Sequence, residues 1–136
     1  MSEGRLEWEA GWTWYRVVGD LDADGPAPLV ILHGGPGAAH DYLEPVTELA
    51  SGAGRPCVVY DQIGCGRSQH LRDAAKSFWT VELFCRELRA LLAHLAIEGR
   101  YHVLGQSWGG MLGMEHALER PAGLRSLVVA NSPASL

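Results

Sequence analysis

The chain has 136 residues, of which 47% are hydrophobic, so it can bury the core of one domain or of part of one. Its formal net charge is -5, with one lysine and scattered arginines, which argues against nucleic acid and anionic membranes as partners. The amino terminus lacks the basic and apolar segments of a signal peptide, and no apolar stretch is long enough to span a bilayer. Because its three cysteines form no C-x-x-C pair, we expect a cytoplasmic protein with reduced thiols.

The amino-terminal part of the chain predicts three strands. Residues 5–8 and 12–18 are rich in β-forming residues and flank a turn that contains Gly11, which predicts a hairpin. Residues 28–32 form a near-continuous apolar run, which is typical of a buried parallel strand. This run ends in HGGPG at residues 33–37, and a glycine loop at the carboxyl end of a strand can present backbone amides to a ligand.

The middle of the chain alternates helix and strand. Apolar residues keep helical spacing from Asp41 until Gly52, where glycine ends the helix. Residues 56–60 are the next predicted strand. Thr80 then caps a long helix, whose apolar stripe faces the core and which Gly99 ends.

The last third of the chain continues this alternation. Residues 101–104 predict a short buried strand, the helix after it stops at Pro121, and residues 127–130 predict a further strand. Strands that alternate with helices predict an α/β fold, with a mostly parallel sheet, helices on both faces and an initial antiparallel hairpin. Because the chain has neither a convincing dinucleotide or phosphate-loop motif nor metal-ligand spacing, we expect no cofactor and no metal.

Residues 105–109 read GQSWG and lie between a predicted strand and a predicted helix, as a G-x-S-x-G nucleophile elbow does. The two glycines allow the strand to turn abruptly into the helix, and this turn lifts the side chain of Ser107 clear of the sheet. We therefore predict that Ser107 is the nucleophile of an acyl transfer. The amide of Trp108 is one predicted donor of the oxyanion hole, and Gly35 is the other because Pro36 has no N–H.

The histidines are not placed to act as the base of Ser107. In proteins with this elbow the acid and the base follow the serine along the chain, and only one histidine, His116, does so here. His116 lies in the following helix, about 13 Å from Ser107 along the axis. We expect His33 to shape its own loop and the other histidines to be satisfied within the fold or to face solvent.

Three motifs together resemble the proline iminopeptidase family of α/β hydrolases: HGGPG at residues 33–37, DQIGCGRS at 61–68 and GQSWGG at 105–110. That family comprises serine peptidases and closely related amino-acid amidases, which release an N-terminal residue, often proline, from a peptide or amide. The likeness covers nearly the whole chain. It is closest to the branch that includes L-amino acid amidases, because Ile63 stands where many iminopeptidases carry arginine.

The resemblance implies that residues 1–136 are the amino-terminal part of a single α/β-hydrolase catalytic domain. A helical cap and the strands that carry the triad acid and histidine are then expected beyond Leu136. The site residues that the resemblance implies are the nucleophile Ser107, the oxyanion-hole residues Gly35 and Trp108, and the substrate-binding residues Gly34 and Asp61.

We therefore expect a serine hydrolase that releases proline or another small or apolar N-terminal residue from a small peptide or an amino-acid amide. The missing carboxyl-terminal half, or a neighbouring chain, is the expected partner that completes the triad. Two alternatives stay open. A carboxylesterase or lactonase of the same fold would use the same serine and amides. The chain could also be a non-catalytic half that needs a partner polypeptide, because its last strand would leave an open sheet edge.

Overall fold

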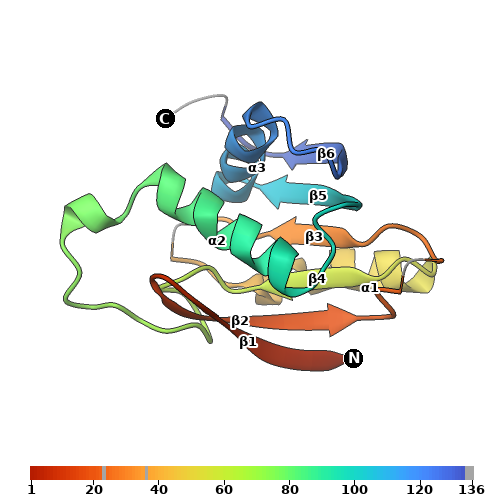
Figure 1. The fold of residues 1–136 in the computed structure, drawn as a ribbon, viewed down its shortest axis with the longest axis horizontal. Helices are drawn as coiled ribbons and strands as arrows, with labels where there is room; N and C mark the ends of the chain where they lie inside the picture. The colour runs from red at the N-terminus through yellow and green to blue at the C-terminus, as the bar shows by residue number, and fades with distance from the viewer. Residues whose placement is uncertain (23, 36, 134–136) are drawn as a thin grey trace.

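The computed structural model describes residues 1–22, 24–35 and 37–133. Six strands form one sheet in the order β1-β2-β4-β3-β5-β6 (Figure 1). The strands are β1 (Ser2–Trp8), β2 (Gly11–Val18), β3 (Leu29–Leu32), β4 (Cys57–Tyr60), β5 (Tyr101–Gln106) and β6 (Leu124–Ala130).

The pairing of the strands confirms the predicted sheet. β1 pairs with β2, and β2 with β4, in antiparallel orientation. β3 pairs with β4 and β5, and β5 with β6, in parallel orientation. The carboxyl ends of the four parallel strands therefore lie at one edge of the sheet, which is where α/β proteins bind their ligands.

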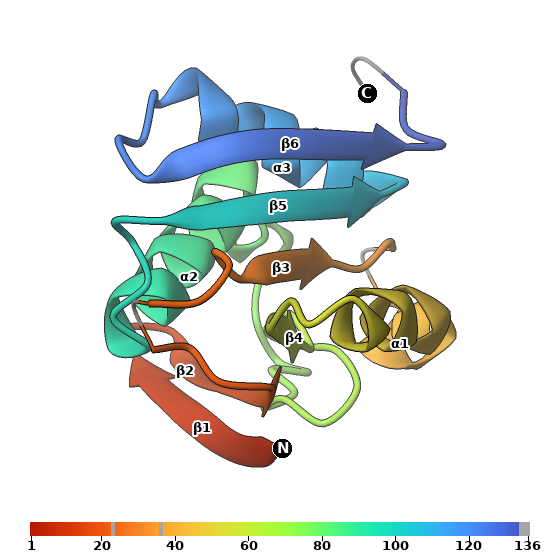
Figure 2. The same cartoon turned by 90° about the vertical axis from the view of Figure 1, so that its right-hand side faces the viewer.

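Helices cover both faces of the sheet, as Figures 1 and 2 show. The helical segments are η1 (His40–Leu43), α1 (Glu44–Gly52), η2 (Lys76–Phe78), α2 (Val81–His94) and α3 (Trp108–Leu118), of which η1 and η2 are 3₁₀ turns. α2 and α3 pack on one face and α1 on the other. Because side chains alternate along a strand, Val30 and Leu32 enter the larger core under α2 and α3, whereas Ile31 enters the smaller core under α1.

The end of α2 differs from the sequence prediction. Thr80 caps its start, since its hydroxyl accepts a hydrogen bond from Leu83 N at 3.1 Å, as expected. The helix ends at His94, however, five positions before Gly99. Ala96 takes the left-handed conformation there, with φ 56°, and donates to Ala93 O while Ile97 donates to Leu92 O. This is a Schellman motif with alanine in place of glycine, and burial of the Ile97 side chain holds it.

The segment at α1 also differs from the prediction. Residues 40–43 form a 3₁₀ turn, and the α-helix starts at Glu44 with Pro45 in its first turn, because proline is preferred where the helical N–H groups have no partner. Leu49, which shares the apolar spacing of this helix, is 77% exposed. It borders an open apolar groove between α1 and the sheet instead of a closed core.

Candidate active site

Ser107 sits on a strained turn between β5 and α3. Its backbone has φ 56° and ψ -121°, a combination that residues with a side chain rarely adopt. Two contacts with the end of β6 hold this turn: Ser107 N donates to Ala130 O at 2.9 Å, and Ser132 Oγ donates to Ser107 O at 2.8 Å. The nucleophile elbow predicted from the sequence is therefore present in its backbone geometry.

The glycines of the elbow are required by backbone contacts. A Cβ at Gly105 would lie 2.5 Å from the carbonyl carbon of Gly109, and one at Gly109 would lie 2.6 Å from His33 O. Backbone atoms cannot move aside as the end of a flexible side chain can. Gly105 thus allows the end of β5 to approach the first turn of α3, and Gly109 allows that turn to pack against the carboxyl end of β3.

In the glycine loop after β3, Gly34 and Gly35 differ in exposure and in hydrogen bonding. Gly34 is buried, and its N–H donates to the Tyr42 hydroxyl at 2.6 Å, which in turn donates to Gln106 Oε1 at 2.6 Å. Gly35 is exposed, with φ 120°. The Gly34 amide is therefore already engaged within the protein, whereas direct contact of Gly34 with a substrate stays a prediction.

The backbone N–H groups of Gly35 and Trp108 are the predicted donors of the oxyanion hole. Within residues 1–22, 24–35 and 37–133, the amides of Gly35 and Trp108 are paired with no backbone or side-chain acceptor. Trp108 is the first residue of α3, where helical N–H groups lack an intrahelical partner and the helix dipole favours negative charge. This is the condition that an oxyanion-hole donor must meet, and their convergence on one oxygen stays a prediction.

Asp61 holds the loops around the site together. It is fully buried, and its Oδ1 accepts from both His40 N and His40 Nδ1 at 2.8 Å, while Oδ2 accepts from Arg67 N at 2.9 Å. Its carboxylate thus joins the segment after HGGPG to the DQIGCGRS loop. These contacts favour a structural role, and direct substrate binding by Asp61 stays a prediction.

Each of the six histidines has a hydrogen-bonding partner other than Ser107. The partners are Gln62 and Gly34 for His33, Asp61 for His40, Gly66 for His70, Tyr15 for His94, Ser126 for His102 and Tyr101 for His116. Burial lowers the pKa of both His33 and His116, so both rings are neutral near pH 7. Among the described residues, no histidine ring is hydrogen-bonded to Ser107.

Glu87 is a buried residue that sequence reasoning missed. It lies on α2 with no exposed surface, and its Oε2 accepts from Ile63 N at 2.7 Å and from Thr13 Oγ1 at 2.5 Å. Burial raises the pKa of this carboxyl from 4.5 to about 8, although the two hydrogen bonds oppose the shift. The sequence did contain a signal for Glu87, because this glutamate lies within the apolar stripe of the helix that includes Phe84 and Leu88.

Ile63, the residue of the DQIGCGRS loop that favoured the amidase branch in the resemblance, is also fully buried. Its side chain belongs to the core under α2, and its amide is held by Glu87. The side chain at position 63 therefore packs in the core of this chain. Its relation to prolyl or amidase specificity stays a prediction.

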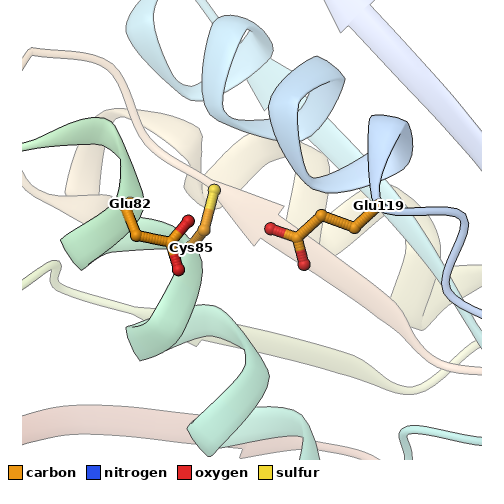
Figure 3. Close-up of side chains that lie close together, drawn as sticks. All are labelled: Glu82, Cys85 and Glu119. Atoms are coloured by element: carbon orange, nitrogen blue, oxygen red, sulfur yellow. The ribbon is translucent and has the colours of Figure 1, made fainter.

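Glu82, Cys85 and Glu119 lie together between α2 and the end of α3, with ligand atoms within 4.8 Å of one another (Figure 3). Arg89 occupies this cluster, since its guanidinium bonds Glu82 Oε1 at 3.0 Å and Glu119 Oε1 at 2.6 Å. Burial raises the pKa of the Cys85 thiol to about 12, so without a metal ion the thiol is protonated near neutral pH. The cluster is accounted for as an ion-pair network.

The comparisons with known proteins agree with this geometry. Residues 27–136 match the family described as the alpha/beta hydrolase fold, which defines the class of this protein. The "Proline iminopeptidase" of Lactiplantibacillus plantarum is 46% identical over 124 residues, which cover 90% of this chain and 42% of the relative. The chain belongs to the proline iminopeptidase family of α/β hydrolases.

Solved structures extend this likeness. The crystal structure of proline iminopeptidase from Mycobacterium smegmatis superimposes with a TM-score of 0.89 at 47% identity, and that of VinJ with a TM-score of 0.92 at 56% identity. Both alignments cover 98% of this chain and 44% of the other chain. The chain thus spans less than half the length of the proteins that it matches.

A search of the described residues for membrane spans found no helix with enough length and apolar character to cross a bilayer. The cytoplasmic location expected from the sequence stays a prediction.

Proposed function

We propose that this chain supplies the nucleophile and the oxyanion hole of a serine hydrolase that releases an N-terminal amino acid from small peptides or amino-acid amides. The observation that carries this proposal is the strained turn at Ser107, which is directly followed by an unpaired amide at the start of α3. Relatives named proline iminopeptidase support the substrate class. In the complete protein the released residue is proline or another small or apolar amino acid.

In the proposed reaction, Ser107 Oγ attacks the carbonyl carbon of the N-terminal residue. A histidine from outside this chain takes the hydroxyl proton and returns it to the leaving amine, so that the C–N bond breaks and an ester forms on Ser107. The amides of Gly35 and Trp108 hold the oxyanion, each contributing about 3 kcal/mol to the stability of the transition state. Water then attacks the ester and releases the amino acid.

The test is an assay of the complete protein on prolyl and alanyl amides, next to simple acyl esters. We expect cleavage of the aminoacyl amides, and a loss of about 10⁴-fold or more in kcat for Ser107→Ala, as in serine proteases that lose a member of the triad. Ser51→Ala is a suitable comparison, because it removes an exposed hydroxyl on α1, away from the elbow. Activity confined to esters would instead identify a carboxylesterase or lactonase on the same residues.

The proposal includes a partner that completes the domain, the remainder of the same protein or a neighbouring chain. Its support is exposed apolar surface: the groove beside α1 has a volume of about 420 Å³ and is lined by Leu29, Val46 and Leu49, with Leu104 and Val128 from the sheet. In the sheet of the described residues β6 pairs only with β5, and Val128 and Val129 on it are 50% and 40% exposed (Figure 2). Surfaces of this kind mark protein contacts.

Size-exclusion chromatography of residues 1–136 alone tests this part of the proposal. We expect self-association that decreases when Leu49→Arg and Val128→Arg are introduced together, because charge on the groove removes the apolar contact. A stable, soluble monomer of the unchanged chain would show that no partner is needed to cover these surfaces.

A further inference from the structure

Gln62 is a fully buried polar residue of the DQIGCGRS motif, and the proposed reaction gives it no role. It lies two residues after β4, in the loop that reads DQIGCGRS. β4, β3 and β5 are neighbours in that order, so the end of β4 is separated from the nucleophile elbow by the end of β3. A side chain from this loop must cross the end of β3 to reach the elbow.

The amide of Gln62 makes this crossing. Its Oε1 accepts a hydrogen bond from the indole Nε1 of Trp108 at 2.8 Å, and its Nε2 donates to the backbone oxygen of His33 at 2.9 Å. One side chain thus bonds the residue after the nucleophile and the first residue of the HGGPG loop at the same time. An amide is the side chain that can accept one of these bonds and donate the other.

A third hydrogen bond fixes His33. The backbone N–H of Gln62 donates to His33 Nε2 at 2.9 Å, so this nitrogen carries no proton. The proton of the neutral ring then lies on Nδ1, which donates to Gly34 O at 2.7 Å. The ring therefore links Gln62 to Gly34, the residue directly before Gly35.

These bonds connect Gln62 to both proposed donors of the oxyanion hole. Gly35 lies two residues after His33, and Trp108 carries the other donor on its own backbone. Phe84 packs edge-on against the Trp108 ring with centroids 5.6 Å apart, so the indole is held from a second side. Oxyanion-hole catalysis depends on donors that are fixed before the charge develops, and a displacement of about 1 Å can cost about a hundredfold in rate.

We propose that Gln62 is a positioning residue, which sets the spacing of the Gly35 and Trp108 amides by binding His33 O and Trp108 Nε1 together. This inference rests on the proposed function, since it concerns the oxyanion hole of that reaction. Its role is to stabilise the tetrahedral transition state, and it contacts no substrate.

The experiment uses the complete protein with Gln62→Met, which keeps the volume and removes both side-chain hydrogen bonds. We expect kcat to fall by about tenfold to a hundredfold, less than for loss of a whole donor, while KM changes by less than about threefold. The affinity for an α-aminoboronic acid, whose adduct on Ser107 mimics the tetrahedral intermediate, should fall by the same factor as kcat. Active-site titration with a fluorophosphonate normalises each sample to folded, reactive enzyme.

Trp108→Phe tests the same contact from its other side and keeps the proposal testable if Gln62→Met does not fold. It should also lower kcat and boronate affinity, and the double variant should lose less than the product of the two single losses, because the singles remove one shared hydrogen bond. Gln69→Met is the matched control. Gln69 directly follows the DQIGCGRS loop, and its Oε1 accepts a hydrogen bond from Trp12 N at 3.0 Å. This bond is separate from those of Gln62. It should lower the melting temperature and leave kcat unchanged.

The outcomes separate this inference from the proposed function. If Gln62→Met and Trp108→Phe keep the kcat and boronate affinity of the unchanged protein and lower only the melting temperature, Gln62 is a structural residue and the inference is wrong. The same holds if their losses multiply in the double variant. If Ser107→Ala keeps its activity in parallel assays, the proposed function itself fails. An inactive Ser107→Ala beside the expected losses at Gln62 supports both.

Discussion

Glu87 of α2 accepts a hydrogen bond from the backbone N–H of Ile63 at 2.7 Å, at a position closed to solvent. A helix on one face of the sheet is thereby bonded to the loop whose preceding residue, Gln62, contacts His33 and Trp108. One buried carboxyl therefore holds the backbone of the loop that carries Gln62.

The raised pKa of Glu87 predicts a pH dependence of stability. Since the pKa of Glu87 is about 8 in the folded protein and near 4.5 when unfolded, the folded state keeps a proton between these values that the unfolded state releases. The contribution of Glu87 to the free energy of unfolding therefore falls as pH rises from about 4.5 to about 8, and is level above that range.

Glu87→Gln should remove this component from the complete protein, because the amide has no proton to release. Urea unfolding between pH 5 and pH 9 measures it, with Glu98→Gln as the control at an exposed position. We expect Glu87→Gln to gain stability relative to the unchanged protein as the pH rises, and Glu98→Gln to follow the unchanged protein. Parallel curves for Glu87→Gln and the unchanged protein would contradict a raised pKa.

A methyl group at Gly109 should disrupt the elbow. The Cβ of Gly109→Ala would meet His33 O at 2.6 Å, and a backbone contact of this kind should cost about 1 to 3 kcal/mol and displace Ser107. Denaturant unfolding and turnover of the complete protein report the two effects. Gly99→Ala, with no neighbour within 4 Å of its Cβ, should change neither. Equal behaviour of the two variants would refute the steric argument.

The left-handed residue at the end of α2 offers a stabilising change. Ala96 has φ 56° and is exposed, so Ala96→Gly should raise the free energy of unfolding by about 0.5 to 1 kcal/mol, because glycine adopts this conformation without strain. Ala93→Gly, within the helix, should lower it by a similar amount. Chemical denaturation measures the free energy of unfolding of both variants. Changes of the same sign at both positions would be inconsistent with the Schellman motif.

A substitution at Asp61 distinguishes a structural role of this residue from a role in substrate binding. In Asp61→Asn, the amide nitrogen takes the place of one carboxylate oxygen, so either Arg67 N or His40 loses its acceptor. This loss should lower the free energy of unfolding by about 1.5 to 3 kcal/mol. Once rates are normalised to titrated active sites, we expect KM to change by less than about twofold. Asp73→Asn, at an exposed position, is the control for the loss of one charge. A large rise in KM without loss of stability would instead support direct binding of the substrate by Asp61.

The fold was predictable because each strand and helix carries its own periodic signal. The apolar run before residue 33 indicated a buried parallel strand, and residues 56–60 were predicted as the next strand. Ser107 was found because glycines are needed where a strand turns abruptly into a helix. Such features depend on neighbours in the sequence. The end of α2 at His94 was missed because the burial of Ile97, a tertiary contact, outweighs the preference for glycine at Ala96.

The supporting contacts of the site could not be predicted in the same way. Gln62 bonds Trp108 across 46 positions of the sequence, and Glu87 bonds Ile63 across 24. Nothing in the local sequence pairs these residues, because the pairing follows from the order of the strands and the placement of α2. Leu49 was similarly ambiguous, since helical spacing places it beside the sheet but cannot say what covers it.

The central claim is that Ser107 is the nucleophile. The most direct measurement is to treat the complete protein with a fluorophosphonate and to locate the adduct by peptide mass spectrometry, in parallel with turnover of an aminoacyl amide. Our account predicts one adduct, on Ser107, that forms in proportion to the loss of turnover and is absent in Ser107→Ala. Full loss of turnover with the adduct on another residue, or undiminished turnover with Ser107 fully labelled, would contradict it.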